Sequence, residues 1–162
     1  MTQHRTLPGT PPRRAQSGSI AIETAFAMLF LLVFIAIPLF LGRVLWYYSV
    51  AEKAAHDGAR FLSNVAQHEI VGAAGSGGQV PIAKLAEAIA NAEVEEIKPA
   101  LDWHAIGVLC DLDVCGSTIP QTVRVSVQLR IRDNFFGPIT REVFAEDALT
   151  LNARVTMRYV GN

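Results

Sequence analysis

Residues 24–42 read TAFAMLFLLVFIAIPLFLG, a run of 19 residues without a charged side chain. At about 1.5 Å of rise per residue, a helix of this length spans about 28 Å, close to the hydrocarbon thickness of a bilayer. The whole chain has 162 residues, of which 51% are hydrophobic and 18% are charged. The sequence therefore predicts one transmembrane helix attached to one modest domain.

The charges on either side of this run predict its orientation. The segment before the run carries Arg5, Arg13 and Arg14 and no acidic residue, whereas residues 43–162 hold 11 basic and 14 acidic residues. Because basic flanks stay in the cytoplasm, we expect a single-pass protein of the inner membrane with a periplasmic or extracellular C-terminal domain. The formal net charge of −1, without a basic stripe, argues against a nucleic-acid partner.

A carboxylate, Glu23, lies at the start of the apolar run. Insertion of a carboxylate into a bilayer costs roughly 2.5–3.5 kcal/mol, so such a residue indicates a function. The N-terminus is open to three interpretations: an uncleaved signal anchor, a secretory signal cut after Ala51, or a leader removed between Gly18 and Ser19. In the third, Glu23 becomes the fifth mature residue, and the new α-amine can offset its charge. The apolar run is longer than a secretory core of about 7–15 residues.

Glycine followed by a small residue, then Glu23 and an apolar helix, resembles the processing motif of type IV prepilins. The following stretch GRVLWYYSVAEKAAHDGARF, residues 42–61, resembles the TadE-like and TadF-like pseudopilins of the tight-adherence (Tad) pilus system. The resemblance covers residues 13 to about 65, with Thr24 and Leu29 departing from the family pattern. The matching residues are Gly42, Arg43, Tyr47, Tyr48, Ala54, Ala55, Gly58, Ala59 and Arg60.

This resemblance implies a minor pseudopilin-like structural component that acts by packing and is not an enzyme. Its cleavage site would be Gly18 and Ser19, and Glu23 would serve assembly. The implied partners are a prepilin peptidase, other pilins or pseudopilins, the Tad inner-membrane assembly platform and membrane lipid. The alternative is an uncleaved, membrane-anchored periplasmic domain that binds another molecule.

Beyond Arg43 the helical period continues with a face of small residues. A helix from Ser19 to about Ala66 would be on the order of 70 Å long, so its second half must pack on protein. We expect that half to pack on the chain's own sheet, although helices of neighbouring subunits are the other candidate. The packing residues are Ala51, Ala54, Ala55, Gly58 and Ala59.

Composition divides the chain into five expected segments. They are a cytoplasmic leader (1–18), a transmembrane helix (19–42), an extracytoplasmic helix extension (43–71), a Gly-rich linker (72–80) and an α+β domain (81–162). In the last segment, Pro81 suits the first turn of a helix. The apolar period of that helix places Ile82, Leu85, Ala86 and Ile89 on one face.

Two later segments alternate between apolar and polar residues and predict half-buried strands, at 122–131 and 149–159. A less regular strand is expected at Trp103–Cys110. The predicted fold is α+β, pilin-like, with a long N-terminal helix packed on a small antiparallel sheet. Four arginines on the polar face of the strands are either solvated or form a docking surface for an acidic partner: Arg124, Arg130, Arg154 and Arg158.

Cys110 and Cys115 enclose the six-residue sequence CDLDVC, which predicts a disulfide in an exported domain. A metal site at Asp111 and Asp113 is the weaker interpretation, because the segment is too short for an EF-hand loop. The four histidines show no metal-ligand spacing, and no nucleophile motif is present. We expect no metal, no cofactor and no catalytic residue.

Overall fold

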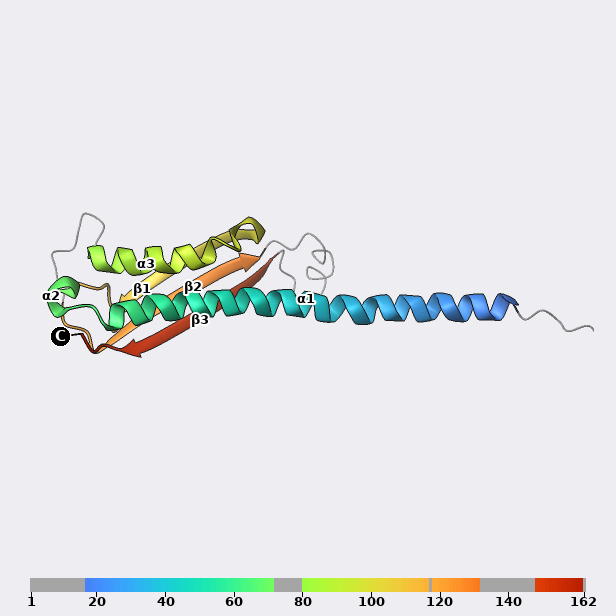
Figure 1. The fold of residues 1–162 in the computed structure, drawn as a ribbon, viewed down its shortest axis with the longest axis horizontal. Helices are drawn as coiled ribbons and strands as arrows, with labels where there is room; N and C mark the ends of the chain where they lie inside the picture. Colours follow the sequence, from blue (N-terminus) through green and yellow to red (C-terminus); the bar gives the residue numbers. More distant parts are fainter. Residues whose placement is uncertain (1–16, 72–79, 117, 132–147, 162) are drawn as a thin grey trace, which may run out of the picture. The chain divides into compact units, whose positions relative to one another are not determined.

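A computed structural model describes residues 17–71, 80–116, 118–131 and 148–161. The expected leader up to residue 16, most of the Gly-rich linker and residues 132–147 lie outside the described residues. The elements are the helices α1 (Ser17–Ser63), α2 (Gln67–Ile70) and α3 (Pro81–Val94), the 3₁₀ turn η1 (Lys98–Ala100), and the strands β1 (Leu101–Cys110), β2 (Thr122–Ile131) and β3 (Leu149–Arg158) (Figure 1). The predicted α+β class is confirmed.

The chain divides into two compact units after Gly42. The first unit is the N-terminal part of α1, whose apolar side chains are exposed along its length. Among the described residues, one helix is long and apolar enough to cross a membrane, and it lies within Ile20–Ser63. The helix that the apolar run predicted is therefore present.

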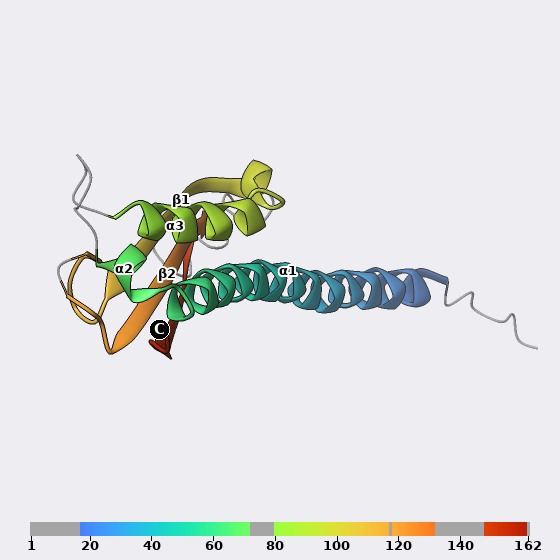
Figure 2. The same ribbon diagram turned by 60° about the vertical axis from the view of Figure 1, so that its left-hand side comes forward.

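The second unit contains a three-stranded antiparallel sheet in the order β1-β2-β3. Val125 of the central strand pairs with Val108 of β1 and with Val155 of β3, so apolar residues of all three strands share one face. Within this unit, residues 43–63 of α1 and the whole of α3 cover that face (Figures 1 and 2). The core lies between the helices and the sheet, as the strand alternation predicted.

The predicted buried face of α3 is only partly correct, because Ala86 is buried and Ile82 packs against the core, but Leu85 is not buried. The structure buries Ala83, Ala86, Ala90 and Val94, whereas Leu85 is 49% exposed. The buried face is therefore turned by one residue, which is about 100° around the helix. Short side chains face inward because α3 lies close to the backbones of α1 and the sheet, where a row of larger residues would not fit.

The helix α1 also ends earlier than predicted, at Ser63, and α2 follows as a separate short helix. The Ser63 hydroxyl and the side-chain amide of Asn64 donate to the Arg60 carbonyl at 2.9 and 2.8 Å. Such side-chain bonds compete with the backbone ladder and favour a helix end. The strands differ from prediction only at their ends, with β1 beginning at Leu101 and β3 ending at Arg158.

The C-terminal segment after β3 holds the end of α1 in place. The Tyr159 hydroxyl, which is buried, donates to the Val65 carbonyl at 2.6 Å, and the Val160 amide donates to the Ser63 carbonyl at 2.9 Å. The pKa of Tyr159 is raised, mainly because its hydroxyl is buried and to a smaller extent because of the negative charge of Glu69. A Cβ atom on Gly161 would lie 1.9 Å from the Val65 carbonyl oxygen, so this close approach requires glycine.

Candidate functional site

The residues of the expected cleavage motif lie at the start of α1. The helix begins at Ser17, which places Gly18 and Ser19 in its first turn. Glu23 is exposed, and it forms no ion pair within the described residues. Its neighbour Thr24 donates its hydroxyl to the Ile20 carbonyl at 2.7 Å. The threonine therefore satisfies its own hydroxyl within the helix, while the carboxylate still needs a partner in an apolar surrounding.

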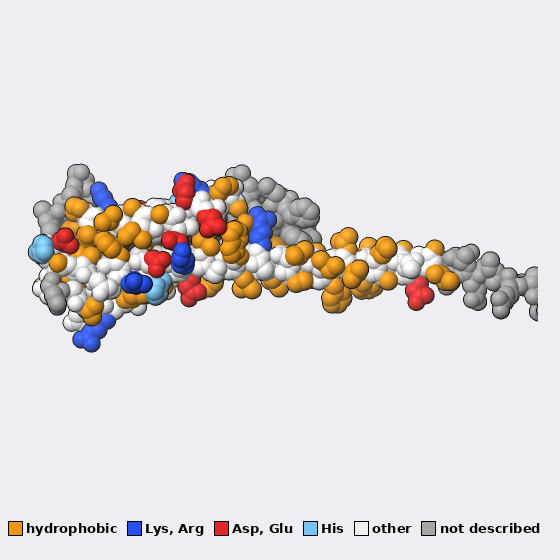
Figure 3. Space-filling view, in the orientation of Figure 1, with side chains coloured by type: hydrophobic (Ala, Val, Ile, Leu, Met, Phe, Trp, Pro, Cys, Tyr) orange, Lys and Arg blue, Asp and Glu red, His pale blue; other side chains and the backbone are white. Residues whose placement is uncertain are grey.

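Large, exposed apolar side chains precede and follow Glu23 in the sequence and continue to the end of the first unit. Figure 3 shows apolar side chains along this part of α1. An apolar surface of this extent, on all sides of a helix, requires lipid or other protein around it. The exposed residues are Ile20, Ile22, Phe26, Met28, Leu29, Phe30, Leu31, Leu32, Val33, Phe34, Ile35, Ile37, Leu39 and Leu41.

Aromatic residues follow directly after the apolar segment. Trp46 and Tyr48 are exposed, whereas Tyr47 is buried, with its ring centroid 5.2 Å from that of Trp46. The Arg43 side chain donates through Nε to the Tyr47 hydroxyl at 2.9 Å. Exposed tryptophan and tyrosine next to a basic residue are typical of the boundary between lipid and water.

The small-residue face of α1 lies in the core of the second unit. Ala51, Ala54, Ala55 and Ala59 are all fully buried. A Cβ atom added to Gly58 would lie 3.3 Å from the Ala86 carbonyl oxygen of α3 and 3.4 Å from Val125 of β2. The glycine therefore packs against a helix backbone on one side and the central strand on the other, so this face serves packing within the chain.

Two lysines contact the acidic residues at the C-terminal end of α3. Lys53 of α1 lies 2.5 Å from Glu93, and Lys98 lies 3.0 Å from Glu95. The hydrogen bond and then the charge of Glu93 raise the pKa of Lys53 above its ordinary value of 10.5. The first pair joins α1 to α3 and is not visible in the helical periodicity, whereas the second joins residues three apart in the chain.

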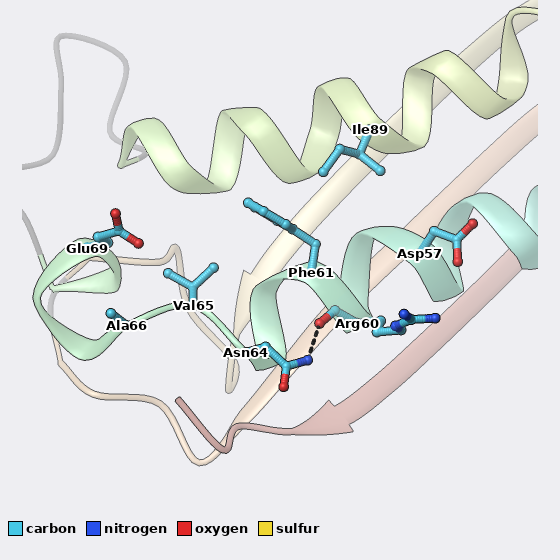
Figure 4. Close-up of a pocket in the computed structure, with 8 residues that line it drawn as sticks. All are labelled: Asp57, Arg60, Phe61, Asn64, Val65, Ala66, Glu69 and Ile89. Atoms are coloured by element: carbon cyan, nitrogen blue, oxygen red, sulfur yellow. Dashed lines mark hydrogen bonds between the residues drawn. The ribbon is translucent and has the colours of Figure 1, made fainter. Parts of the chain in front are cut away.

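A surface hollow of about 670 Å³ lies where α1 ends (Figure 4). It is formed by the last turn of α1, the following turn, α2 and one residue of α3. Phe61 and Ile89 supply apolar surface, and Arg60, the last residue of the matching signature, is also part of the lining. The other lining residues are Asp57, Asn64, Val65, Ala66 and Glu69. This mixed lining has no arrangement of nucleophile and base that would indicate catalysis.

Cys110 and Cys115 form a disulfide, as the sequence predicted. Their loop is further closed by backbone bonds between Cys110 and Asp113 in both directions. The Asp111 carboxylate accepts the backbone N–H of Thr122 at 2.8 Å and that of Gln121 at 3.1 Å. The bond from Thr122 is the main cause of a lowered Asp111 pKa. The carboxylate thus holds the two ends of the connection together.

No group of three or more His, Cys, Asp or Glu residues within the described ranges is arranged to hold a metal ion. His104 of β1 instead lies with Nε2 at 3.1 Å from the Asn91 side-chain oxygen of α3.

One comparison with known proteins gives a match. A family model described as TadE-like protein matches residues 18–60, from the glycine of the expected cleavage motif to Arg60. No curated protein and no solved structure matches the chain. The resemblance that the sequence motifs predicted is therefore confirmed for this segment, and all of the matched residues lie within α1.

Proposed function

We propose that this protein is a minor pseudopilin-like component of a Tad-type pilus or a related secretion pseudopilus. A prepilin peptidase would cut it between Gly18 and Ser19, releasing the leader 1–18. The helix 19–42 would remain in the inner membrane, with residues 43–162 on its outer side. Other pilins and the inner-membrane assembly platform would be its partners.

The observation that carries this proposal is the extent of the TadE-like match, which runs from Gly18 to Arg60. It includes the cleavage motif, the apolar helix and the small-residue face, and so unites features that a plain membrane anchor would not need together. The length and composition of α1 support the membrane location.

Glu23 is the residue to which the proposal assigns assembly. Its carboxylate is exposed amid apolar side chains and lacks an ion pair within the described part of α1. Cleavage before Ser19 creates a positively charged amine four residues away. In a low-dielectric surrounding, attraction between the two charges offsets part of the cost of placing each in lipid. The amine of a neighbouring subunit serves equally well and would set the axial position of one helix against the next.

The first test is the N-terminus of the full-length protein co-expressed with its prepilin peptidase. We expect N-terminal sequencing to begin at Ser19 and Gly18→Leu to leave the leader attached. Gly42→Leu is the matched control, because no atom lies within 4 Å of a Cβ added there. A wild-type chain that still begins at Met1 would support the uncleaved anchor, and one that begins at Glu52 would support the secretory signal.

The second test separates cleavage from assembly. We expect Glu23→Gln, which keeps the side-chain shape but removes the charge, to be cut normally and to enter the assembly at least tenfold less often. Glu52→Gln is the control, since it removes an exposed carboxylate from the same helix beyond the apolar segment. Incorporation is measured as the fraction of the processed protein in sheared surface filaments. Equal incorporation of both variants would remove the role assigned to Glu23.

A further inference from the structure

The disulfide loop presents large apolar side chains away from the core of the domain. Leu112 at its tip is 86% exposed, and Val114 and Ile119 in the same connection are also exposed. An exposed leucine alone is ordinary, but three apolar residues on one short connection form a candidate contact surface. None of these three residues belongs to the hydrophobic core, to which the adjoining strands β1 and β2 contribute.

The loop is held in one shape before any partner arrives. The disulfide closes it, the Cys110 amide donates to the Asp113 carbonyl at 2.9 Å, and the Asp113 amide donates back at 3.1 Å. The carboxylate of Asp111 also accepts the Thr122 hydroxyl at 3.0 Å. A preorganised loop loses little conformational entropy on binding, so its exposed leucine is suited to act as an anchor.

The position of the loop favours a protein partner over lipid. The Tyr159 amide donates to the Gln121 carbonyl, and the Val160 amide donates to the Ser63 carbonyl, so the loop lies at the end of the domain where α1 ends (Figures 1 and 2). Arg43 directly follows the apolar run 24–42 in the sequence. It precedes Ser63, the last residue of α1, by 20 residues. That separation corresponds to about 30 Å of helix.

The charge of the loop indicates the kind of surface it fits. Between Cys110 and Cys115 it carries Asp111 and Asp113 and no basic residue. Asp111 is engaged by the backbone, whereas the Asp113 side chain accepts only the neighbouring Val114 amide at 2.9 Å among the described contacts. A complementary surface would combine apolar contact with positive charge.

The outer face of the sheet has these properties. Arg124 is paired with Thr156 and Arg154 with Ser126, so the two arginines are diagonal neighbours on adjacent strands. Like charges at such positions repel each other unless a negative group approaches. Within the described residues, Arg154 forms no ion pair, and Arg124 bonds through Nε to the Thr156 hydroxyl at 3.1 Å.

Trp103 adds apolar surface to the same face. It pairs with Arg130 on the side away from α3 and is 51% exposed. Tryptophan and arginine are the residue types most enriched among the anchors of protein interfaces. The centre of this face carries only short side chains, because Gly107 pairs with Ser126 there.

We propose that the disulfide loop of one copy of this protein docks on the outer sheet face of a second copy. Leu112 contacts the centre of that face at Gly107 and Ser126. Arg124 and Arg154 are close enough there to face Asp113, and Trp103 lies further along β1. The loop and the sheet face are different surfaces, so each copy can donate one and accept on the other. Contacts of this heterologous kind either close into a ring or extend into an open array, depending on the rotation between copies. The inference adds a subunit contact to the proposed assembly role, on which it rests.

The test uses the full-length protein in membranes, with a photoreactive benzoylphenylalanine at position 112. We expect irradiation to give a covalent dimer whose cross-linked peptides map to the strands of the second copy, β1, β2 or β3. Asp113→Arg alone and Arg154→Asp alone should each lower the dimer yield at least fivefold. Co-expression of the two single variants should restore it, because the exchanged charges then face each other. The control Lys84→Asp, an exposed lysine of α3, should leave the yield unchanged.

Cross-links that map to the helices, to lipid or to a different protein would overturn the proposal. Co-expression of the two variants without recovery of the dimer yield would also overturn it. Unfolding curves of each single variant must match those of the wild type, which excludes loss of yield through misfolding. Sequencing the N-terminus of the same samples tells the two proposals apart. An intact leader with charge-dependent dimers would defeat only the processing, and a mature N-terminus without dimers would defeat only this contact.

Discussion

The two parts of α1 make opposite use of one helix. From Ile20 to Leu41 its surface consists largely of exposed, bulky apolar side chains, whereas from Ala51 to Ala59 its inward positions are small and fully buried. The difference shows how the surroundings select residues: lipid accepts any apolar shape, but a helix that lies against a sheet and another helix needs short side chains at the contact.

This comparison predicts that the two parts respond differently to the same change in volume. Lipid rearranges around an added side chain, whereas a packed core must move its own backbone or distort its rotamers. All of the following measurements use urea unfolding of the full-length protein in detergent micelles, followed by tryptophan fluorescence.

The largest effect is expected for Gly58→Leu. The new Cβ would lie 3.3 Å from the Ala86 carbonyl oxygen, and the rest of the side chain would meet Val125. We expect the free energy of unfolding to fall by about 3 kcal/mol, the upper end of the usual cost of overpacking. Gly42→Leu, the same substitution where nothing lies within 4 Å, should change it by less than about 0.5 kcal/mol. Equal losses in the two variants would contradict the comparison.

A smaller effect is expected from opening the disulfide with the double substitution of Cys110 and Cys115 by serine. Closing a six-residue loop restricts the unfolded chain by about 2 kcal/mol. We expect that loss in the free energy of unfolding, with no change in helical content below the transition. Reduction of the wild type should reproduce it, and an unaltered unfolding midpoint would show that backbone bonds alone hold the loop.

Tyr159→Phe tests the C-terminal segment that holds the end of α1. It removes the bond to the Val65 carbonyl, which should cost about 1 kcal/mol. Tyr48→Phe, which alters an exposed tyrosine, is the control and should have no measurable effect. Because burial raises the Tyr159 pKa above 10, the contribution is fully present below pH 10 and is lost as the pH rises further. A difference between the variants that persists at high pH would contradict this assignment.

The smallest effect is expected from Lys53→Met, which removes the exposed ion pair between α1 and α3 while keeping most of the side chain. We expect a small decrease in the unfolding midpoint, and none for Lys84→Met. The pKa of Lys53 is raised above 10.5, so the stabilisation is complete below that pH and disappears as the pH rises through the folded value. A midpoint difference that grows with pH would exclude the ion pair as its source.

Several features were predictable because local sequence controls them. The apolar run, the strand alternation at 122–131 and the close spacing of Cys110 and Cys115 each constrain structure over a few residues. The face that α3 buries was not predictable in this way. Its apolar residues fit two adjacent orientations, and the choice depended on how closely α1 and the sheet approach it.

The contacts that join distant parts of the chain could not be predicted from the sequence pattern either. Tyr159 was expected simply as the last apolar residue of a strand, yet its hydroxyl reaches a carbonyl 94 residues earlier. Lys53 and Glu93 are separated by 40 residues and belong to different helices. No periodicity within one element contains information about such pairs.

The sequence by itself determined the apolar helix, its TadE-like motif and the alternating strands, because hydrophobic period and length act locally along the chain. Only the tertiary structure decided which side of α3 is buried, where α1 ends and which distant residues meet. Those outcomes depend on the distances between backbones that meet only after folding, and packing at these distances selects among helix faces that are almost equally apolar.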